Sequence, residues 1–105
     1  RRKAYRAPYV IVVICEPKEA DHVEWIEEIA ACACAAQNML LAAHSLGLGA
    51  MWRTGKAAYH ERVKEAFNVS DNGAIVGFIY VGYPDVEPKN VKRMPLEDKV
   101  EWWSK

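Results

Sequence analysis

The stretch His44-Ser-Leu-Gly-Leu-Gly-Ala-Met-Trp-Arg-Thr-Gly55 ends a long apolar segment and opens a different kind of structure. Gly47 and Gly49 predict the end of a helix, because glycine adopts the left-handed conformation of a helix C-terminus without a Cβ penalty. An aromatic ring, a guanidinium, a hydroxyl and a third glycine follow at once, as Trp52, Arg53, Thr54 and Gly55. This run is typical of one side of a pocket.

The segment before this stretch predicts a helix from about His22 to Ser45. Asp21 offers a carboxylate as N-cap and Glu24 follows three residues later, which is a capping-box pattern. The first turns are amphipathic, but residues 30–36 carry only small side chains. Such a helix is expected at the centre of a protein or against a symmetry-related copy. The amides of residues 37 and 38 then bond either to neighbouring backbone or to a ligand.

Two apolar runs predict strands. Tyr9–Cys15 is β-branched without polar alternation, as in a strand covered on both faces. Ala74–Gly82 is the second, with Gly77 marking a bulge or a close approach of another backbone. A helix is expected from Ala57 or Ala58 to Phe67. The order of strands and helices predicts an α+β, or α/β layered, domain with helices on the faces of its sheet.

We expect this domain to cover residues 1–84 and a C-terminal tail to cover residues 85–105. Prolines keep much of the tail extended, and residues 95–103 predict a short helix with proline in its first turn. Trp102 and Trp103 are adjacent and would be poorly covered in a lone small domain. They pack either on another subunit or back on this chain's own core.

Composition limits the class of protein. A chain of 105 residues buries about 60–70% of its unfolded surface, yet 51% of its residues are hydrophobic. We therefore expect an oligomer or a missing partner segment. Fourteen basic residues balance 14 acidic ones, which argues against nucleic acid as a partner. The only basic cluster, Arg1, Arg2, Lys3 and Arg6, is predicted to be a solvated lead-in to the first strand, and the chain to be the later part of a longer protein.

The three cysteines predict no disulfide framework. Cys32 and Cys34 lie about 200° apart around a helix and cannot ligate one metal together. All three are interpreted as small buried apolar residues in a reducing cytoplasm. The most apolar run, Ile29–Ala43, is shorter than the roughly 20 residues of a membrane span. We expect a soluble, cytoplasmic protein without membrane contact.

Few residues suggest chemistry. Gly47 and Gly49 follow a helix and lack a third glycine, so they are not a dinucleotide-binding fingerprint. His22, His44 and His60 are isolated, and we predict surface or helix-end positions for them, with no metal site and no catalytic acid or base. Arg53 offers a planar fork of donors for phosphate or a carbonyl-rich ring. A core Trp52 with Arg53 in a salt bridge is an equal alternative.

A second spot that could bind an anion, Lys92-Arg93, lies in the tail. Without further information it is a solvated surface pair. Several segments in order nevertheless match a known pattern: Arg6-Ala-Pro8 before the first strand, Ala35-Ala-Gln-Asn-Met-Leu-Leu-Ala-Ala43, Gly47–Gly55, Ile75–Pro84 and Arg93-Met-Pro-Leu-Glu-Asp98. With these segments, nearly the whole chain resembles the C-terminal half of the flavin-dependent nitroreductase family, in particular its small NAD(P)H nitroreductase branch.

The resemblance implies a nitroreductase-like α+β fold, with a mixed central sheet flanked by helices, in an intertwined homodimer that binds FMN at the subunit interface. The segment matching Trp52, Arg53, Thr54 and Gly55 contacts the flavin, and the arginine matching Arg93 meets the FMN phosphate. The proposed NAD(P)H segment matches Ala42, Ala43, His44, Ser45, Leu46 and Gly47. Hydride then passes from NAD(P)H to the flavin N5 and on to a nitroaromatic, quinone or similar small acceptor.

The family's N-terminal half carries an Arg-Arg-Ser phosphate motif and a loop on the flavin's other face, and neither is found in these residues. Arg1-Arg2 is not that motif, since Lys3 and Ala4 follow and a strand comes next. The alternative function is therefore a non-catalytic remnant or dimerisation module that lacks a complete flavin site.

Overall fold

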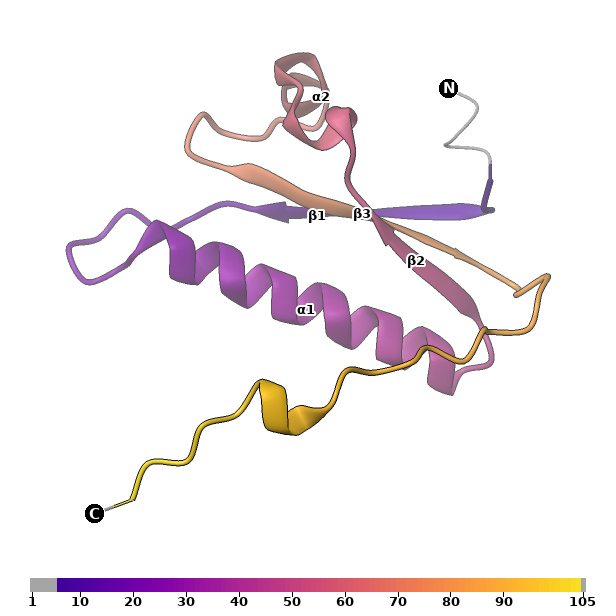
Figure 1. Cartoon of the computed structure of the whole chain (residues 1–105). Coiled ribbons are helices and arrows are strands. Elements are labelled where there is room, and N and C mark those ends of the chain that lie inside the picture. Colours follow the sequence, from indigo (N-terminus) through magenta and orange to yellow (C-terminus); the bar gives the residue numbers. More distant parts are fainter. Residues whose placement is uncertain (1–5, 105) are drawn as a thin grey trace.

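The computed structural model describes residues 6–104. Arg1, Arg2 and Lys3 of the predicted basic lead-in lie outside the described residues, as do the two ends of the predicted domain and tail. Figure 1 shows the elements in chain order. They are β1 (Tyr9–Cys15), α1 (Trp25–Ser45), β2 (Gly49–Arg53), the 3₁₀ helix η2 (Lys56–Tyr59), α2 (Glu61–Ala66), β3 (Ala74–Gly82) and the 3₁₀ helix η3 (Leu96–Asp98).

The three strands form one sheet in the order β1-β3-β2, so the last strand in sequence is the central one. Both ladders are antiparallel. In Figure 1, α1 lies along one face of this sheet and α2 lies over the other. The α+β class and both predicted strands are confirmed. The mixed character expected of the sheet is absent among the strands of residues 6–104.

β3 is bulged where it meets Trp52. Val13 of β1 pairs with Gly77, but the next residue, Ile14, pairs with Ile75, which leaves Val76 as the extra residue. The indole Nε1 of Trp52 donates to the Val76 carbonyl oxygen over 3.2 Å. A Cβ at Gly77 would lie 2.5 Å from Cδ1 of Trp52, nearer still to Nε1, and 3.3 Å from the Arg53 carbonyl oxygen. The sequence predicted a bulge or a close backbone approach at Gly77, and both are present.

α1 ends where the sequence predicts. Gly47 has φ +77°, the Leu48 N–H donates to the Ala43 carbonyl over 2.9 Å, and the Gly47 N–H donates to the His44 carbonyl over 3.1 Å. Together these form a Schellman motif. Gly49 does not share this role, because it begins β2, where a Cβ would lie 3.3 Å from Pro84.

The predicted start of α1 is wrong. The helix begins at Trp25, and its N-cap is Glu24, whose side chain makes no capping bond. Asp21 lies instead in a preceding turn, which the hydrogen bond from the Val23 N–H to the Ala20 carbonyl closes at 3.0 Å. The capping-box interpretation failed because this turn separates Asp21 from the first helical residue.

The core of the chain is small. Val13, Ala36 and Ile79 are buried together, and Trp52 and Leu40 are among the partly buried residues that pack against them. In α1 only Ala36 and Ala43 are buried, so most of this helix is exposed in the single chain. Gln37 and Asn38 are exposed too, so the expectation of buried amides is wrong here.

β1 is covered less than predicted. Tyr9 is 72% exposed and Ile11 is 41% exposed, and full burial along β1 begins only at Val13. The expectation of a strand covered on both faces therefore holds for its C-terminal part alone.

By length and composition, α1 could cross a membrane, which the shorter run Ile29–Ala43 did not indicate. Core helices and signal sequences meet the same criterion, so one such helix is weak evidence for a membrane protein.

The predicted helix at residues 57–67 divides into η2 and α2. His60 separates them and is the N-cap of α2, where its Nδ1 accepts the Arg62 N–H over 3.1 Å. The predicted helix-end role of this histidine is confirmed. His44 likewise lies in the last turn of α1.

The predicted tail helix is wrong in extent, because only η3 (Leu96–Asp98) is helical, with Pro95 as its N-cap. Trp102 and Trp103 are 89% and 87% exposed. In this structure the two tryptophans do not fold back on the chain's own core. Packing on another subunit stays a prediction.

One polar contact ties the end of β1 to the turn before β3. The Ser70 hydroxyl donates to a Glu16 carboxylate oxygen over 2.5 Å, and the Ser70 N–H donates to the other over 2.9 Å. Both bonds lower the pKa of Glu16, and the bond from the hydroxyl has the larger effect. They do so because they stabilise the ionised carboxylate.

Gly77→Ala should destabilise the chain by about 1–3 kcal/mol, because the new methyl group overlaps the Trp52 indole and breaks its bond to Val76. Urea unfolding followed by circular dichroism measures this. In a double-mutant cycle, Trp52→Leu should remove most of the penalty that Gly77→Ala adds. Strictly additive effects would contradict the contact.

Ser70→Ala should raise the pKa of Glu16 toward its ordinary value, since the hydroxyl donor is lost. Glu16 has a lowered pKa in the folded chain, so its contribution to stability is present above the unfolded pKa and is lost as pH falls through the folded pKa. Carboxyl ¹³C NMR titration measures the shift. Ser45→Ala is the control, because the Ser45 hydroxyl bonds to Ala42 instead. An unchanged Glu16 pKa in Ser70→Ala would refute this assignment.

Candidate functional site

β2 presents its side chains to two different environments. Trp52 pairs with the buried Ile79 and faces α1. Side chains alternate along a strand, so Met51 and Arg53 point to the other face, the one that η2 and α2 partly cover. Arg53 is half-buried, and its Nη1 donates to the Met51 sulfur over 3.6 Å. A thioether is a weak acceptor, so most of the guanidinium's donors remain available to a ligand.

The sequence offered two interpretations of this run, one side of a pocket or a core Trp52 with Arg53 in a salt bridge, and of these calls the structure confirms the core position of Trp52. The Trp52 ring is a core residue, and its N–H is engaged by Val76. Its side chain lines neither of the two cavities described below. Arg53, by contrast, has the Met51 sulfur as its hydrogen-bond partner within residues 6–104, and not a carboxylate. Among residues 6–104, the salt bridge offered as the alternative for Arg53 is not formed.

Thr54 and Gly55 follow β2 and are exposed. Gly55 has φ +68°, a conformation that disfavours a side chain, and it is the N-cap of η2. β2 is also an edge strand, so alternate backbone groups along it have no ladder partner. The sequence analysis did not predict that Gly49–Arg53 is a strand. Within the part of the chain that the structure describes, the result is an open edge with backbone donors outside the ladder, a hydroxyl and a guanidinium close together in sequence.

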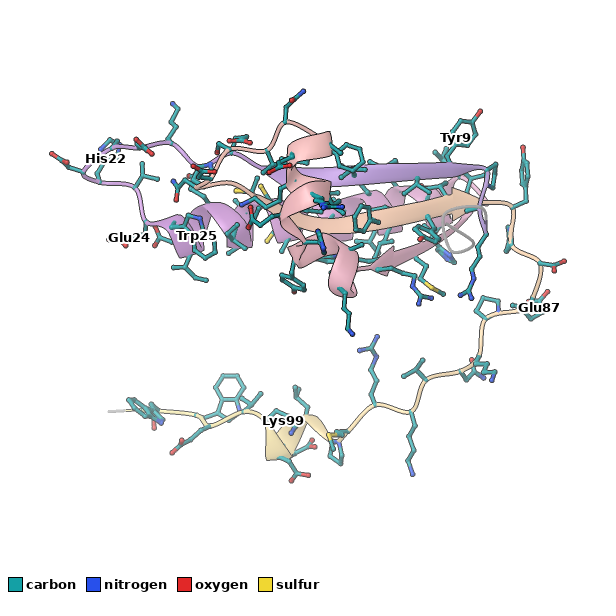
Figure 2. All side chains as sticks on the ribbon, turned by 90° about the horizontal axis from the view of Figure 1, so that it is seen from above. Tyr9, His22, Glu24, Trp25, Glu87 and Lys99 are labelled. Carbon is teal, nitrogen blue, oxygen red and sulfur yellow. The ribbon has the colours of Figure 1, made fainter. Side chains whose placement is uncertain are left out.

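Arg93 does not join this edge within the chain. It is exposed and lies in the extended segment before η3. Figure 2 shows the tail, from Glu87 to beyond Lys99, apart from the sheet and from α2. The two arginines assigned to FMN are therefore presented separately, one by the sheet edge and one by the tail.

The segment Ala42–Gly47 forms the last turn and the cap of α1. Its side chains are exposed except Ala43, and the Ser45 hydroxyl donates to the Ala42 carbonyl over 2.7 Å. His44 and Gly47 line a cavity of about 480 Å³, whose other walls are Leu40, residues 48–50 and residues 84–88. Sequence reasoning did not find this cavity, because only the fold brings the start of the tail against Gly49.

A second cavity, of about 420 Å³, lies between the loop after β1, the start of α1 and Asn72. Trp25 closes one side, and its Nε1 donates to the Asn72 carbonyl over 2.9 Å. None of the predicted site residues lines it. Among the described residues, no group of three His, Cys, Asp or Glu side chains could hold a metal ion.

Comparison with known proteins settles the family. The family model described as "Nitroreductase family" matches residues 1–83. The chain belongs to the nitroreductase family. YfhC of Bacillus subtilis (strain 168), provisionally named an NAD(P)H nitroreductase, is 33% identical over 94 residues, which are 90% of this chain and 48% of YfhC. The chain thus spans about half the length of the curated relatives that it matches.

Solved structures of the nitroreductase family share the fold. A nitroreductase-like family protein from Bacillus cereus has a TM-score of 0.72 and 31% identity, covering 88% of this chain and 49% of that protein. A protein from Desulfovibrio desulfuricans, solved in complex with FMN, has a TM-score of 0.70 and 28% identity, covering 87% of this chain and 52% of its own. The resemblance inferred from sequence is confirmed, and the roles of individual site residues stay predictions.

Proposed function

We propose that this nitroreductase chain forms part of an FMN-dependent oxidoreductase, which passes hydride from NAD(P)H to a nitroaromatic, a quinone or a similar small acceptor. The enzyme would act as a cytoplasmic homodimer. The observation that carries the proposal is the open edge of β2, where the Arg53 guanidinium has a thioether and no carboxylate as its partner. A family relative of the same fold has been solved with FMN.

The residues of this edge fit a flavin in part. Arg53, the Thr54 hydroxyl and the backbone beside Gly55 offer donors, which a carbonyl-rich ring or a phosphate requires. Only the backbone of Trp52 is available to contact a flavin, because its ring is packed over Gly77. FMN, when bound, accepts a hydride and passes it on, and the protein supplies binding and orientation.

Within this proposal the chain's own residues bind and orient the flavin and NAD(P)H. Arg53, Thr54 and Gly55 hold the flavin, and Arg93 on the tail holds the phosphate. The segment Ala42–Gly47 receives NAD(P)H beside the cavity that His44 lines. Arg53 and Arg93 are presented separately in one chain, which suits a site completed by a second subunit. The exposed face of α1 and the exposed Trp102 and Trp103 offer apolar surface for that subunit.

The direct test is flavin retention by the full chain. The chain is mixed with FMN and desalted, and its visible spectrum is recorded before and after addition of NADH or NADPH. The proposal expects bound flavin that is bleached by one of the two nucleotides. A folded chain that keeps no FMN and quenches no flavin fluorescence would favour the alternative, a non-catalytic dimerisation module.

Arg53→Ala should weaken FMN binding about ten- to hundredfold, the loss expected for one hydrogen bond to a charged group, roughly 1.5–3 kcal/mol. Fluorescence titration gives Kd. Arg62→Ala is the matched control, since Arg62 is another arginine but lies exposed on α2, away from the β2 edge. Equal Kd values for the Arg53→Ala chain and the unmodified chain would show that Arg53 does not meet the flavin.

Arg93→Ala tests the phosphate assignment separately. It should weaken binding of FMN but leave binding of riboflavin, which lacks the phosphate, unchanged. Lys92→Ala is the neighbouring control. An equal loss of affinity for FMN and for riboflavin would show that Arg93 does not contact the phosphate.

A further inference from the structure

Two thiols from different elements meet between the sheet and α1. Cys15 is the last residue of β1 and is only 2% exposed. It lies two residues after Val13, so the two side chains share one face of the strand. Val13 packs on Ala36 of α1. The side chain of Cys15 is therefore directed toward α1.

Cys32 lies on the matching stripe of the helix. It is four residues before Ala36, and residues four apart share one face of a helix. It is half-buried, as is Leu40 on the same stripe. The Cys32 thiol is close enough to the Cys15 thiol to raise the pKa of Cys15. Cys34 lies about 200° around the helix from Cys32 and is exposed.

This placement corrects the sequence interpretation of the cysteines. Cys15 is a buried small residue as expected, but Cys32 is half-buried and Cys34 is exposed. Sequence separation gave no indication that Cys15 and Cys32 would be neighbours, since 16 residues lie between them in the chain. Packing of α1 on the sheet creates the pair.

We propose that Cys15 and Cys32 form a reversible disulfide in the folded protein when it meets a peroxide, so that the pair is a redox-sensitive link between β1 and α1. The proposal does not involve flavin, so it stands or falls independently of the proposed function. Intracellular disulfides of this kind are transient and serve redox sensing.

The surroundings of the two thiols set the order of steps. Burial raises the pKa of the Cys15 thiol to about 11, with the neighbouring Cys32 thiol and the charges of Glu28 and Glu16 adding to the effect. Cys15 is thus protonated and shielded from an oxidant in solution, whereas Cys32 is accessible. Cys32 is the thiol that meets peroxide, and Cys15 is the thiol that resolves the product.

The reaction balances with hydrogen peroxide as the oxidant. The Cys32 sulfur attacks one peroxide oxygen, the O–O bond breaks, and one water leaves with the Cys32 proton, which gives a sulfenic acid. The Cys15 sulfur then attacks the Cys32 sulfur, the S–O bond breaks, and the Cys15 proton leaves in a second water. The two thiols lose two electrons and the peroxide gains them.

Small side chains on α1 allow the two backbones to approach. A disulfide requires Cα atoms about 4.4–6.8 Å apart, which is short for a helix and a sheet separated by large side chains. The contact stripe of α1 contains Ala33, Ala36 and Ala43. Because α1 buries only Ala36 and Ala43 in this chain, a small shift of the helix disrupts little packing.

The test uses the full chain in native buffer. Hydrogen peroxide is added, free thiols are blocked with N-ethylmaleimide, and a tryptic digest is analysed by mass spectrometry without reduction. Trypsin separates Cys15, in residues 7–18, from Cys32 and Cys34, in residues 19–53. The expected product is these two peptides joined, lighter by two hydrogens than their sum apart from one added N-ethylmaleimide on Cys34, and separated again by dithiothreitol.

Matched variants assign the partner. Cys34→Ser should form the joined product to the same extent as the unmodified chain, and Cys32→Ser or Cys32→Ala should lose it at least tenfold. The proposal is overturned if the Cys32 variants join Cys15 to Cys34 equally well, if the link forms only in urea, or if all three thiols remain open to blocking after peroxide treatment.

Discussion

The contact of the Trp52 indole with Gly77 is the constraint on which the rest of the chain depends. It fixes β2 against the bulge of β3, because the Nε1–H bonds to the carbonyl of the extra residue Val76. With Trp52 turned inward, strand alternation directs Arg53 outward. The open edge that could bind a flavin is thus a geometric consequence of a core contact, and no separate element is needed to produce it.

The same chain leaves an unusual amount of apolar surface uncovered. Its core comprises few residues, while Leu46, Trp102 and Trp103 are largely exposed. Exposed aromatic residues at a terminus and an open helix face are typical of surfaces that bind another protein segment. The chain spans about half of the relatives that it matches, and the distribution of exposed side chains agrees with a structure that is completed by further protein.

The fold could be inferred from sequence wherever the determining interaction is local. Strand limits at Tyr9–Cys15 and Ala74–Gly82 follow from continuous β-branched runs, and the end of α1 follows from Gly47. Failures occurred where a nonlocal contact decides. Met51 and Trp52 gave no strand pattern, because β2 is a short edge strand that exists only through its pairing with β3. The family resemblance supplied the candidate flavin residues, but it could not show that the Trp52 ring is directed into the core.

The close packing of α1 on the sheet, which its small side chains allow, positions both proposed sites, the Cys15–Cys32 pair and the Arg53 edge. Alanine at positions 36 and 43 lets the helix lie close to the sheet, and the same closeness brings Cys32, in the N-terminal half of α1, to Cys15. At its other end, the Schellman motif of α1 leads within a few residues into β2 and the Arg53 edge. The thiol pair and the Arg53 edge are therefore both positioned by how α1 rests on the sheet, although the redox proposal requires no flavin.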